Sequence, residues 1–251
     1  MSKPSGLILY RGPSLLDGAP IVVVATGLGR SSRNEKTGDM VQTWIIRDDV
    51  RPDHAAKSGD DASVCGDCPH RPVNAGSCYV KTFQAPLSVW NAVHRGVYPT
   101  ADDAGAVSDA GAGRMVRLGS YGDPAAVPVW VWEALTARAK GWTGYTHQWR
   151  VAPALKALCM ASVDDFAEAV TARAQGWRTF RVRTAGEALE PREFICPASA
   201  EAGQKTDCAS CRACMGTDAK AKASPVIVAH GATARRFALY RQGTLVPAIA
   251  A

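Results

Sequence analysis

Seven of the eight cysteines fall into two groups whose short spacing suits metal binding. The later group combines a CxxCxxC run with an earlier cysteine, in the order Cys196, Cys208, Cys211 and Cys214. Thiolates two residues apart on an irregular loop can all turn inward onto one inorganic core. Structural zinc sites more often use two separated CxxC knuckles. The spacing therefore favours an iron–sulfur cluster over zinc, and a disulfide-linked loop is a weaker third reading.

The earlier group contains three cysteines, Cys65, Cys68 and Cys78, in the segment VCGDCPHRPVNAGSCYV. Three thiolates around a 4Fe-4S cluster would leave one iron open to a ligand. A zinc site closed by His70 is the alternative, and a single site that shares ligands from both groups is another. The eighth cysteine, Cys159, lies in the apolar run ALCMASV and is predicted to be a core residue.

Strand and helix patterns alternate along much of the chain. β-branched and large apolar residues predict strands at Leu7–Tyr10, Ile21–Thr26, Met40–Ile46, Met115–Leu118, Trp142–Trp149, Ala157–Val163, Arg178–Arg183 and Pro225–His230. Amphipathic patterns predict helices at Pro86–Gly96, Val127–Lys140 and Asp164–Gln175. The alternation predicts an α/β fold, either a partial (β/α) barrel or an open parallel sheet, with cysteine-rich metal-binding loops.

The chain is expected to form a single α/β domain over residues 1–251. Residues 1–47 form a strand-rich N-terminal segment, and residues 190–217 form a cysteine-rich metal-binding insertion. Asp48–Val80 has no regular pattern, and Thr100–Gly113, which is rich in Ala, Asp and Gly, is predicted to be an exposed loop with some disorder.

Ligands bind at the carboxyl ends of parallel strands, and several polar residues lie there in the sequence. The turn GSYGDP, which follows a predicted strand, offers Gly119, Ser120, Gly122 and Asp123 as ligand-binding residues. The alternative is a tight strand-to-helix turn in which Asp123 interacts favourably with the helix dipole.

Three further residues are candidates for binding a cofactor or substrate. His147 could act as an acid, a base or a ligand, or could be a satisfied core histidine. Arg181 and Arg183 share one face of a strand and could hold a carboxylate or phosphate, or could form an exposed polar face. The polar loop Asn34–Gly38 is not a P-loop and is more simply a turn.

The net charge of +6 permits contact with nucleic acid, but the Lys and Arg residues are scattered. The sequence contains no apolar run of about 18 residues, so we expect no membrane span. The N-terminus lacks the features of a signal peptide, which predicts a cytoplasmic location. A reducing compartment favours metal binding over disulfides.

The order of these motifs resembles the radical S-adenosylmethionine enzymes. In that family a strand precedes a three-cysteine loop, a helix follows, and the next strand ends in a Gly-rich turn that contacts the methionyl amine of the cofactor. Here the strand MVQTWII precedes Cys65, Cys68 and Cys78, and Gly122-Asp123-Pro124 resembles the end of the amine-binding turn. The resemblance implies a 4Fe-4S cluster with S-adenosylmethionine, and the later cysteines resemble auxiliary clusters. The spacing departs from the family's CxxxCxxC, which bears on how the open iron is presented.

A second resemblance covers roughly residues 34–214 and is to a family of cysteine-rich phage proteins described as gene-product-eighty-eight-like. The matching stretches are NEKTG, CYVKTFQAPLSVWNAVHRG, VRLGSYGDP, TGYTHQW and CASCRACMG, in this order. This resemblance implies a phage or mobile-element origin, with the cytoplasm of a bacterial host as the location, and no particular reaction. The competing hypothesis to an enzyme is a non-catalytic iron–sulfur or zinc protein that binds nucleic acid or a protein partner.

Overall fold

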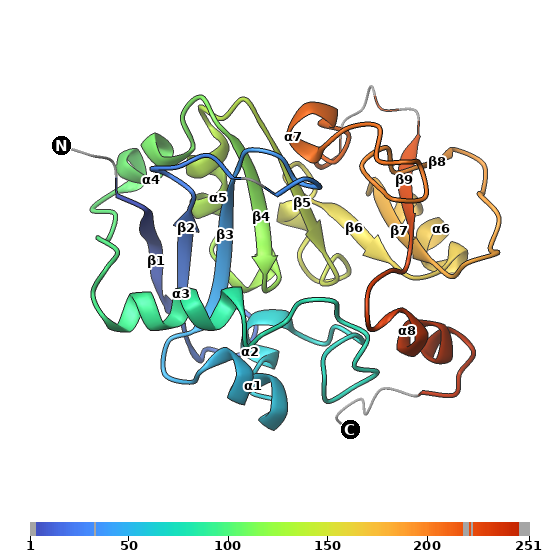
Figure 1. Cartoon of the computed structure of the whole chain (residues 1–251), viewed down its shortest axis with the longest axis horizontal. Helices are drawn as coiled ribbons and strands as arrows, with labels where there is room; N and C mark the ends of the chain where they lie inside the picture. The colour runs from blue at the N-terminus through green and yellow to red at the C-terminus, as the bar shows by residue number, and fades with distance from the viewer. Residues whose placement is uncertain (1–3, 33, 218–220, 222, 246–251) are drawn as a thin grey trace.

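The computed structural model describes residues 4–32, 34–217, 221 and 223–245. Its centre is one nine-stranded sheet with the strand order β1-β2-β3-β4-β5-β6-β7-β9-β8 (Figure 1). The sheet is not closed, because β1 and β8 are its two edges. The prediction of an open α/β sheet is thus confirmed. No helix in the described part of the chain is long and apolar enough to span a membrane.

The first three strands form an antiparallel ribbon, comprising β1 (Gly6–Pro13), β2 (Pro20–Thr26) and β3 (Met40–Arg47). Gly18 has φ of 79° in the turn between β1 and β2, a conformation that favours glycine. Strand β2 carries five consecutive fully buried residues, Ile21–Ala25, because it lies between two neighbours and is covered on both faces.

The parallel part of the sheet begins with β3. It continues through β4 (Met115–Tyr121), β5 (Gly141–Thr146), β6 (Met160–Val163), β7 (Thr179–Arg183), β9 (Ser224–Val228) and β8 (Glu193–Ile195). The prediction that the strands now labelled β4, β5, β6 and β7 are parallel neighbours is confirmed. Strand β8 was not predicted, since its three residues are too short for a pattern.

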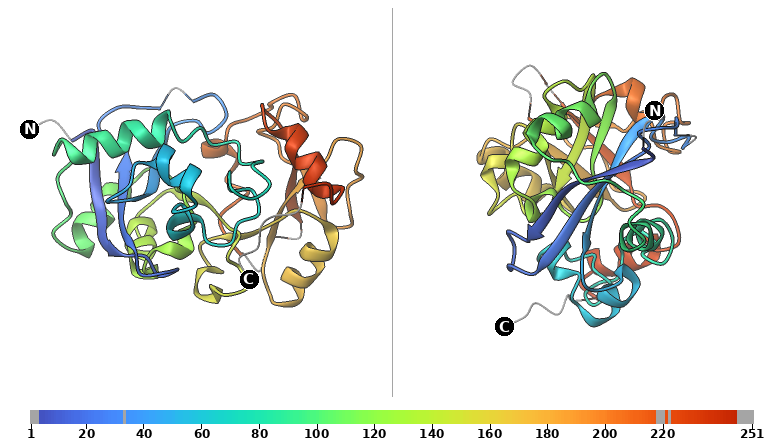
Figure 2. Two further views of the ribbon diagram at one scale, coloured as in Figure 1. Left: turned by 90° about the horizontal axis from the view of Figure 1, so that it is seen from below. Right: turned by 90° about the vertical axis from the view of Figure 1, so that its left-hand side faces the viewer.

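Helices cover the sheet and its carboxyl-end loops (Figures 1 and 2). The predicted helices are observed as α3 (Ala85–His94), α5 (Val129–Thr136) and α6 (Phe166–Ala174). Asp165, rather than Asp164, caps α6. Four short helices lie in segments without a predicted helix: α1 (Pro52–Ser58), α2 (Ala62–Cys65), α7 (Cys208–Cys211) and α8 (Ala234–Arg241). Two single 3-10 turns, η1 (Pro124–Ala126) and η2 (Pro153–Leu155), follow β4 and β5.

The prediction of an exposed loop at Thr100–Gly113 is wrong. Residues Ala104–Gly111 form helix α4, and the Asp103 carboxylate accepts a hydrogen bond from the Ala106 amide at 2.8 Å. The helix packs closely on α5, because a side chain at Gly111 would collide with the Leu135 carbonyl. The small residues of this segment suggested a loop. In the structure they allow α4 to pack closely against α5.

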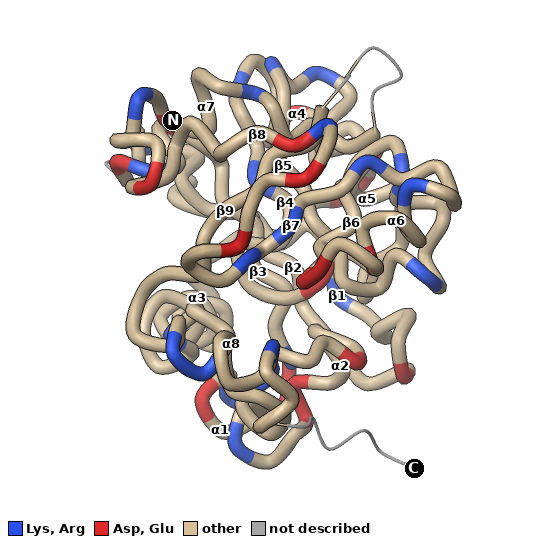
Figure 3. Tube along the Cα trace, turned by 90° about the vertical axis from the view of Figure 1, so that its right-hand side faces the viewer, with Lys and Arg blue, Asp and Glu red and all other residues tan. Residues whose placement is uncertain are grey.

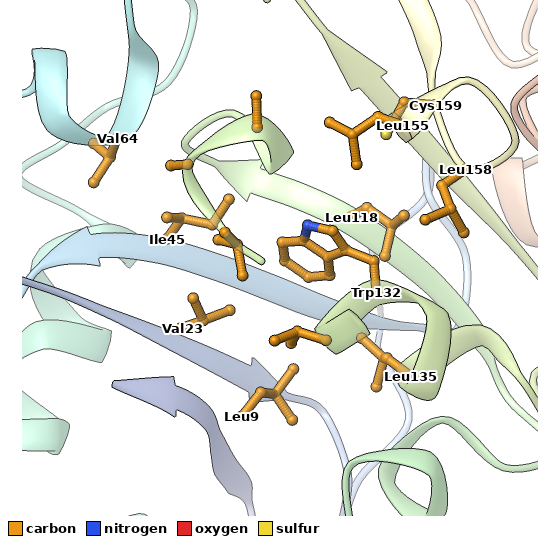
Figure 4. Close-up of a cluster of buried hydrophobic side chains, with 14 of the residues drawn as sticks. Leu9, Val23, Ile45, Val64, Leu118, Trp132, Leu135, Leu155, Leu158 and Cys159 are labelled. Carbon is orange, nitrogen blue, oxygen red and sulfur yellow. The ribbon is translucent and has the colours of Figure 1, made fainter. Parts of the chain in front are cut away.

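The main core lies between the sheet and α5 (Figure 4). Trp132 is fully buried there, and its indole nitrogen donates to the Pro124 carbonyl at 2.9 Å. Cys159 is also fully buried in this core, which agrees with the sequence prediction.

Replacing Trp132 with alanine is expected to lower the free energy of unfolding by about 3–5 kcal/mol, since it leaves a large cavity and an unpaired Pro124 carbonyl. Trp130 lies on the same helix but is 43% exposed, so Trp130→Ala is the matched control. Urea denaturation of both variants should show a small loss for Trp130→Ala. A loss of similar size in both would contradict the assignment of Trp132 to the core.

Candidate metal centres at the two ends of the parallel strands

The first cysteine group lies at the carboxyl ends of the parallel strands. After β3 the chain forms α1 and α2, with Cys65 as the last residue of α2 and Cys68 and Cys78 in the loop that follows. The turn after β4 reaches this segment directly, because the Asp123 amide donates to the Val64 carbonyl at 2.6 Å. The cysteine loop and the turn GSYGDP are therefore neighbours, as the sequence predicted.

Two buried side chains hold the first cysteine loop. Gln148, which follows β5, donates from its amide nitrogen to the Cys65 carbonyl at 3.2 Å and to the Asp67 carboxylate at 2.7 Å. Arg71 donates to the Gly66 and Gly59 carbonyls and pairs with Asp61 at 2.7 Å. These contacts hold the conformation of the loop. Sequence analysis did not identify either residue.

The thiols of the first group share one electrostatic environment. Burial raises the pKa of Cys65 and Cys68 well above the usual value, and nearby Cys78 raises both further. All eight cysteines are free thiols. A metal centre binds thiolates, so its positive charge would replace the thiol protons and offset the cost of burying negative charge here.

Asp123 is fully engaged in hydrogen bonds. Its carboxylate accepts from the Thr146 hydroxyl at 2.7 Å, the Ala125 amide at 2.9 Å and the His147 amide at 2.8 Å. Burial is the main influence on this carboxyl and raises its pKa to about 6. Asp123 therefore caps the 3-10 turn η1, as in the tight turn that was the structural alternative, and it also ties the end of β4 to the end of β5.

The other residues of the turn are also held by the neighbouring strand β3. The Gly119 amide donates to the Thr43 hydroxyl at 2.9 Å, and the Ser120 hydroxyl donates to the Gln42 side chain at 2.7 Å. Gly122 has φ of 83°, and a Cβ atom there would lie 2.6 Å from Cβ of Ile45. Only glycine fits at this position.

Tyr121, in the same turn, is a candidate that the sequence did not single out. Its hydroxyl is buried and has no hydrogen-bond partner within the described structure. Burial raises the pKa of Tyr121 well above its usual value, and Cys65 and Cys78 contribute to the shift. The charges of the first cysteine group therefore act on this hydroxyl.

Helix α7 of the second cysteine group lies beside the loop that precedes β3, and α7 and α2 lie at opposite ends of the sheet (Figure 1). Strand β8 leads into Cys196, and helix α7, capped by Asp207, carries Cys208 and Cys211. All four cysteines, including Cys214, line one cavity. The remaining lining comes from Thr143, Tyr145, Pro197, Ala198, Ala213 and Pro225. This is the convergence that the CxxCxxC pattern predicts.

The polar loop before β3 supports this second group. The Cys208 amide donates to the Lys36 carbonyl at 3.0 Å, and the Ala209 amide donates to the Thr37 carbonyl at 3.1 Å. Gly38, with φ of 68°, lies so close to Asp207 that a Cβ atom would be 2.6 Å from its carboxylate. The loop Asn34–Gly38 is thus a turn, as the sequence analysis expected, and it positions the segment that carries Cys208 and Cys211.

Positive charge lies beside the second group. Burial raises the pKa of Cys208, while Arg117 and Lys36 lower it. Burial also raises the pKa of Cys214, to about 12. The two cations favour a bound centre with anionic thiolates, and neither belongs to a salt bridge of the described structure.

The distance between cysteine sulfur atoms can be compared with the distance expected around one zinc ion. Thiolates around one tetrahedral zinc lie about 3.8 Å apart, since each Zn–S bond is about 2.3 Å. Among the described residues, which include all eight cysteines, no three cysteines have sulfur atoms all within 4.8 Å of one another. Neither cysteine group therefore has the compact arrangement of a bound tetrahedral ion. His70 does not join the cysteines in such a set; it groups with His147 and Asp164.

Arg181 and Arg183 lie on the opposite face of β7 from the second group. Phe180 and Val182 pack with Cys196, so the alternate side chains point away. Arg181 forms a bidentate pair with Glu193 at 2.9 and 2.7 Å, and Arg183 pairs with Glu201. Both guanidinium groups are buried and engaged within the chain rather than exposed.

The Arg181–Glu193 pair gives a stability prediction. Replacing Arg181 with methionine is expected to lower the free energy of unfolding by about 3–5 kcal/mol, because it leaves the fully buried Glu193 carboxylate with Arg173 at 3.4 Å as its one charged partner among the described residues. The double variant Arg181→Met/Glu193→Leu should recover most of this loss in urea denaturation. If Arg181→Met is as stable as the parent, the pair with Glu193 does not stabilise the fold. The guanidinium group would then be available to bind a ligand.

Basic and acidic residues are interspersed along the chain trace (Figure 3). Many arginines pair with carboxylates, for example Arg11 with Asp48 and Arg150 with Glu168. This arrangement gives no specific support to the nucleic-acid contact that the net charge permits.

Comparisons with known proteins returned no match for this chain. The sequence matches no protein-family model, no curated protein is significantly similar to it, and no solved structure is significantly similar to its fold.

Proposed function

We propose that this chain is an iron–sulfur protein with two clusters, and that the cluster at Cys65, Cys68 and Cys78 binds S-adenosylmethionine at an open iron. One observation carries the proposal. Three cysteines follow the first parallel strand, at the carboxyl ends of the sheet, beside the turn that follows the second parallel strand. Ligands of α/β sheets bind at these ends.

The donor set supports iron–sulfur clusters over zinc. Each group consists of thiols, the preferred ligands of such clusters. Among the described residues no three cysteine sulfur atoms lie within 4.8 Å of one another, and the imidazole of His70 is directed at Asp164 instead of closing the first group. The fourth position of the first group is thus left for an external ligand.

The turn after β4 supports the choice of an amino acid-like ligand. Because the Asp123 carboxylate is occupied, the backbone of Gly119–Gly122 is the part of the turn available to a ligand amine. Tyr121 adds a buried, unpartnered hydroxyl beside the cysteines in this part of the structure. A bound cluster would supply one electron, from an external reductant, for cleavage of S-adenosylmethionine.

The second cluster would serve electron transfer to the first. Tyr79 follows Cys78 directly, and its hydroxyl accepts a hydrogen bond from Arg117 at 2.8 Å. Arg117 in turn acts on Cys208 of the second group. Arg117 thus interacts with residues from both cysteine segments. The proposed phage or mobile-element origin rests on the order of the sequence motifs alone.

Titration of the anaerobically reduced protein with S-adenosylmethionine tests the proposal. Electron paramagnetic resonance should show one of two cluster signals change on addition, because only the first cluster has an open iron. S-adenosylhomocysteine, which lacks the reactive sulfonium, is the control for cleavage and should give no 5′-deoxyadenosine. An unchanged spectrum would leave a structural iron–sulfur protein and reject the enzyme.

A further inference from the structure

A second kind of ligand group lies beside the first cysteine group. The side chains of His70, His147 and Asp164 place one ligand atom each within 4.8 Å of one another. His70 Nε2 lies 3.0 Å from the Asp164 carboxylate, and the His70 and His147 rings are 5.3 Å apart between centroids. Within the described residues this is the one group of three or more potential ligands that is this compact.

The fold explains why these residues meet. His147 directly follows β5 and Asp164 directly follows β6, and these strands are parallel neighbours. Their carboxyl ends therefore present both residues at the edge of the sheet where ligands bind. His70 comes from the loop between Cys68 and Cys78, which covers this edge.

The surroundings of the group are those of a metal site. His147 Nε2 is buried and has no hydrogen-bond partner in the described structure. His70 Nδ1 lies 2.6 Å from the Ser77 hydroxyl, which fixes the ring with Nε2 directed at the group. Orienting contacts of this kind accompany metal-ligating histidines. Phe237 and Tyr240 of α8 cover His70, with ring centroids 5.6 Å away, and so limit access of water.

We propose that His70, His147 and Asp164 bind one divalent transition-metal ion of the zinc class, separate from the cysteine centres. Two imidazoles and one carboxylate are the ligands of many zinc sites that keep a fourth position for water or substrate. Ligand atoms about 3.4 Å apart surround a tetrahedral ion with bonds of about 2.1 Å. The separation of 3.0 Å between His70 and Asp164 is close to this value, and a small movement of His147 completes the site.

The test uses the protein with its clusters intact and zinc as the probe. After incubation with zinc chloride and desalting, we expect one zinc per chain, with the iron content unchanged. X-ray absorption at the zinc edge should show only nitrogen and oxygen ligands at about 2.0–2.1 Å. His147→Ala and the isosteric Asp164→Asn should each reduce zinc retention at least about tenfold. His54→Ala, at an exposed histidine, is the matched control and should retain zinc.

The outcomes separate this inference from the iron–sulfur proposal. Sulfur ligands at about 2.3 Å would place the zinc in a cysteine group and overturn the inference. Failure to retain zinc, or retention in both folded variants, would overturn it as well. Iron content in each variant shows whether the chain is folded around its clusters. Absence of iron in the parent protein would contradict the iron–sulfur proposal alone, because the histidine site uses no cysteine.

Discussion

Replacing Cys214 with serine is expected to remove the second cluster and to destabilise the protein strongly. Cys214 is buried in the cavity formed by all four cysteines of the group, and it receives a hydrogen bond from Tyr145. Metal binding at a structural thiolate site contributes about 10–16 kcal/mol, and this energy also stabilises the fold. The iron content should fall by about four per chain, as one 4Fe-4S cluster is lost. Denaturation should occur at a much lower urea concentration.

Cys159→Ala is the matched control for this change. Cys159 is also buried, but it lies in the apolar core and does not line the cavity of the second cysteine group. Its removal is expected to lower stability modestly and to leave the iron content unchanged. Equal iron content in Cys214→Ser and the parent would show that this thiol binds no cluster.

Replacing Cys68 with serine is expected to abolish reaction with S-adenosylmethionine. Cys68 belongs to the group at the carboxyl ends of the strands, where three thiolates leave one iron open. Formation of 5′-deoxyadenosine should fall at least about 100-fold, which corresponds to about 2.7 kcal/mol of activation free energy. The second cluster should remain, because its four cysteines line a separate cavity that does not include Cys68.

The assay for this variant is product formation by chromatography, together with iron content. A variant that retains about four irons but forms no product agrees with the proposal. Product formation at the parent rate in Cys68→Ser would mean that the first cysteine group has no part in the reaction.

Much of the sheet could be predicted from the sequence because its strands are buried on both faces. Runs such as Ile21–Ala25 and Met115–Leu118 contain large or β-branched apolar residues, and such runs are typical of covered strands. The alternation with helices then predicts parallel pairing. The convergence of Cys196, Cys208, Cys211 and Cys214 also follows from local spacing. These features depend on residues close together in the chain.

Features that depend on distant partners could not be predicted in this way. Arg181 is paired by Glu193 on a strand that follows a long loop, so its engagement has no local signal. Asp123 could be either a ligand or a structural acceptor until its contacts with Thr146 and His147 were known. Asp164 was placed at the start of a predicted helix, although its position after a parallel strand is the signal that would have identified it as a ligand. Helix α4 was missed because small residues favour close packing as well as loops.

Determination of iron, acid-labile sulfide and zinc in the anaerobically purified parent protein tests the central claim most directly. Two 4Fe-4S clusters predict about eight irons and about eight sulfides per chain, with a Mössbauer spectrum typical of such clusters. The Cys159→Ala variant should give the same values. A colourless protein with about two sulfur-coordinated zinc ions per chain and no sulfide would contradict the account.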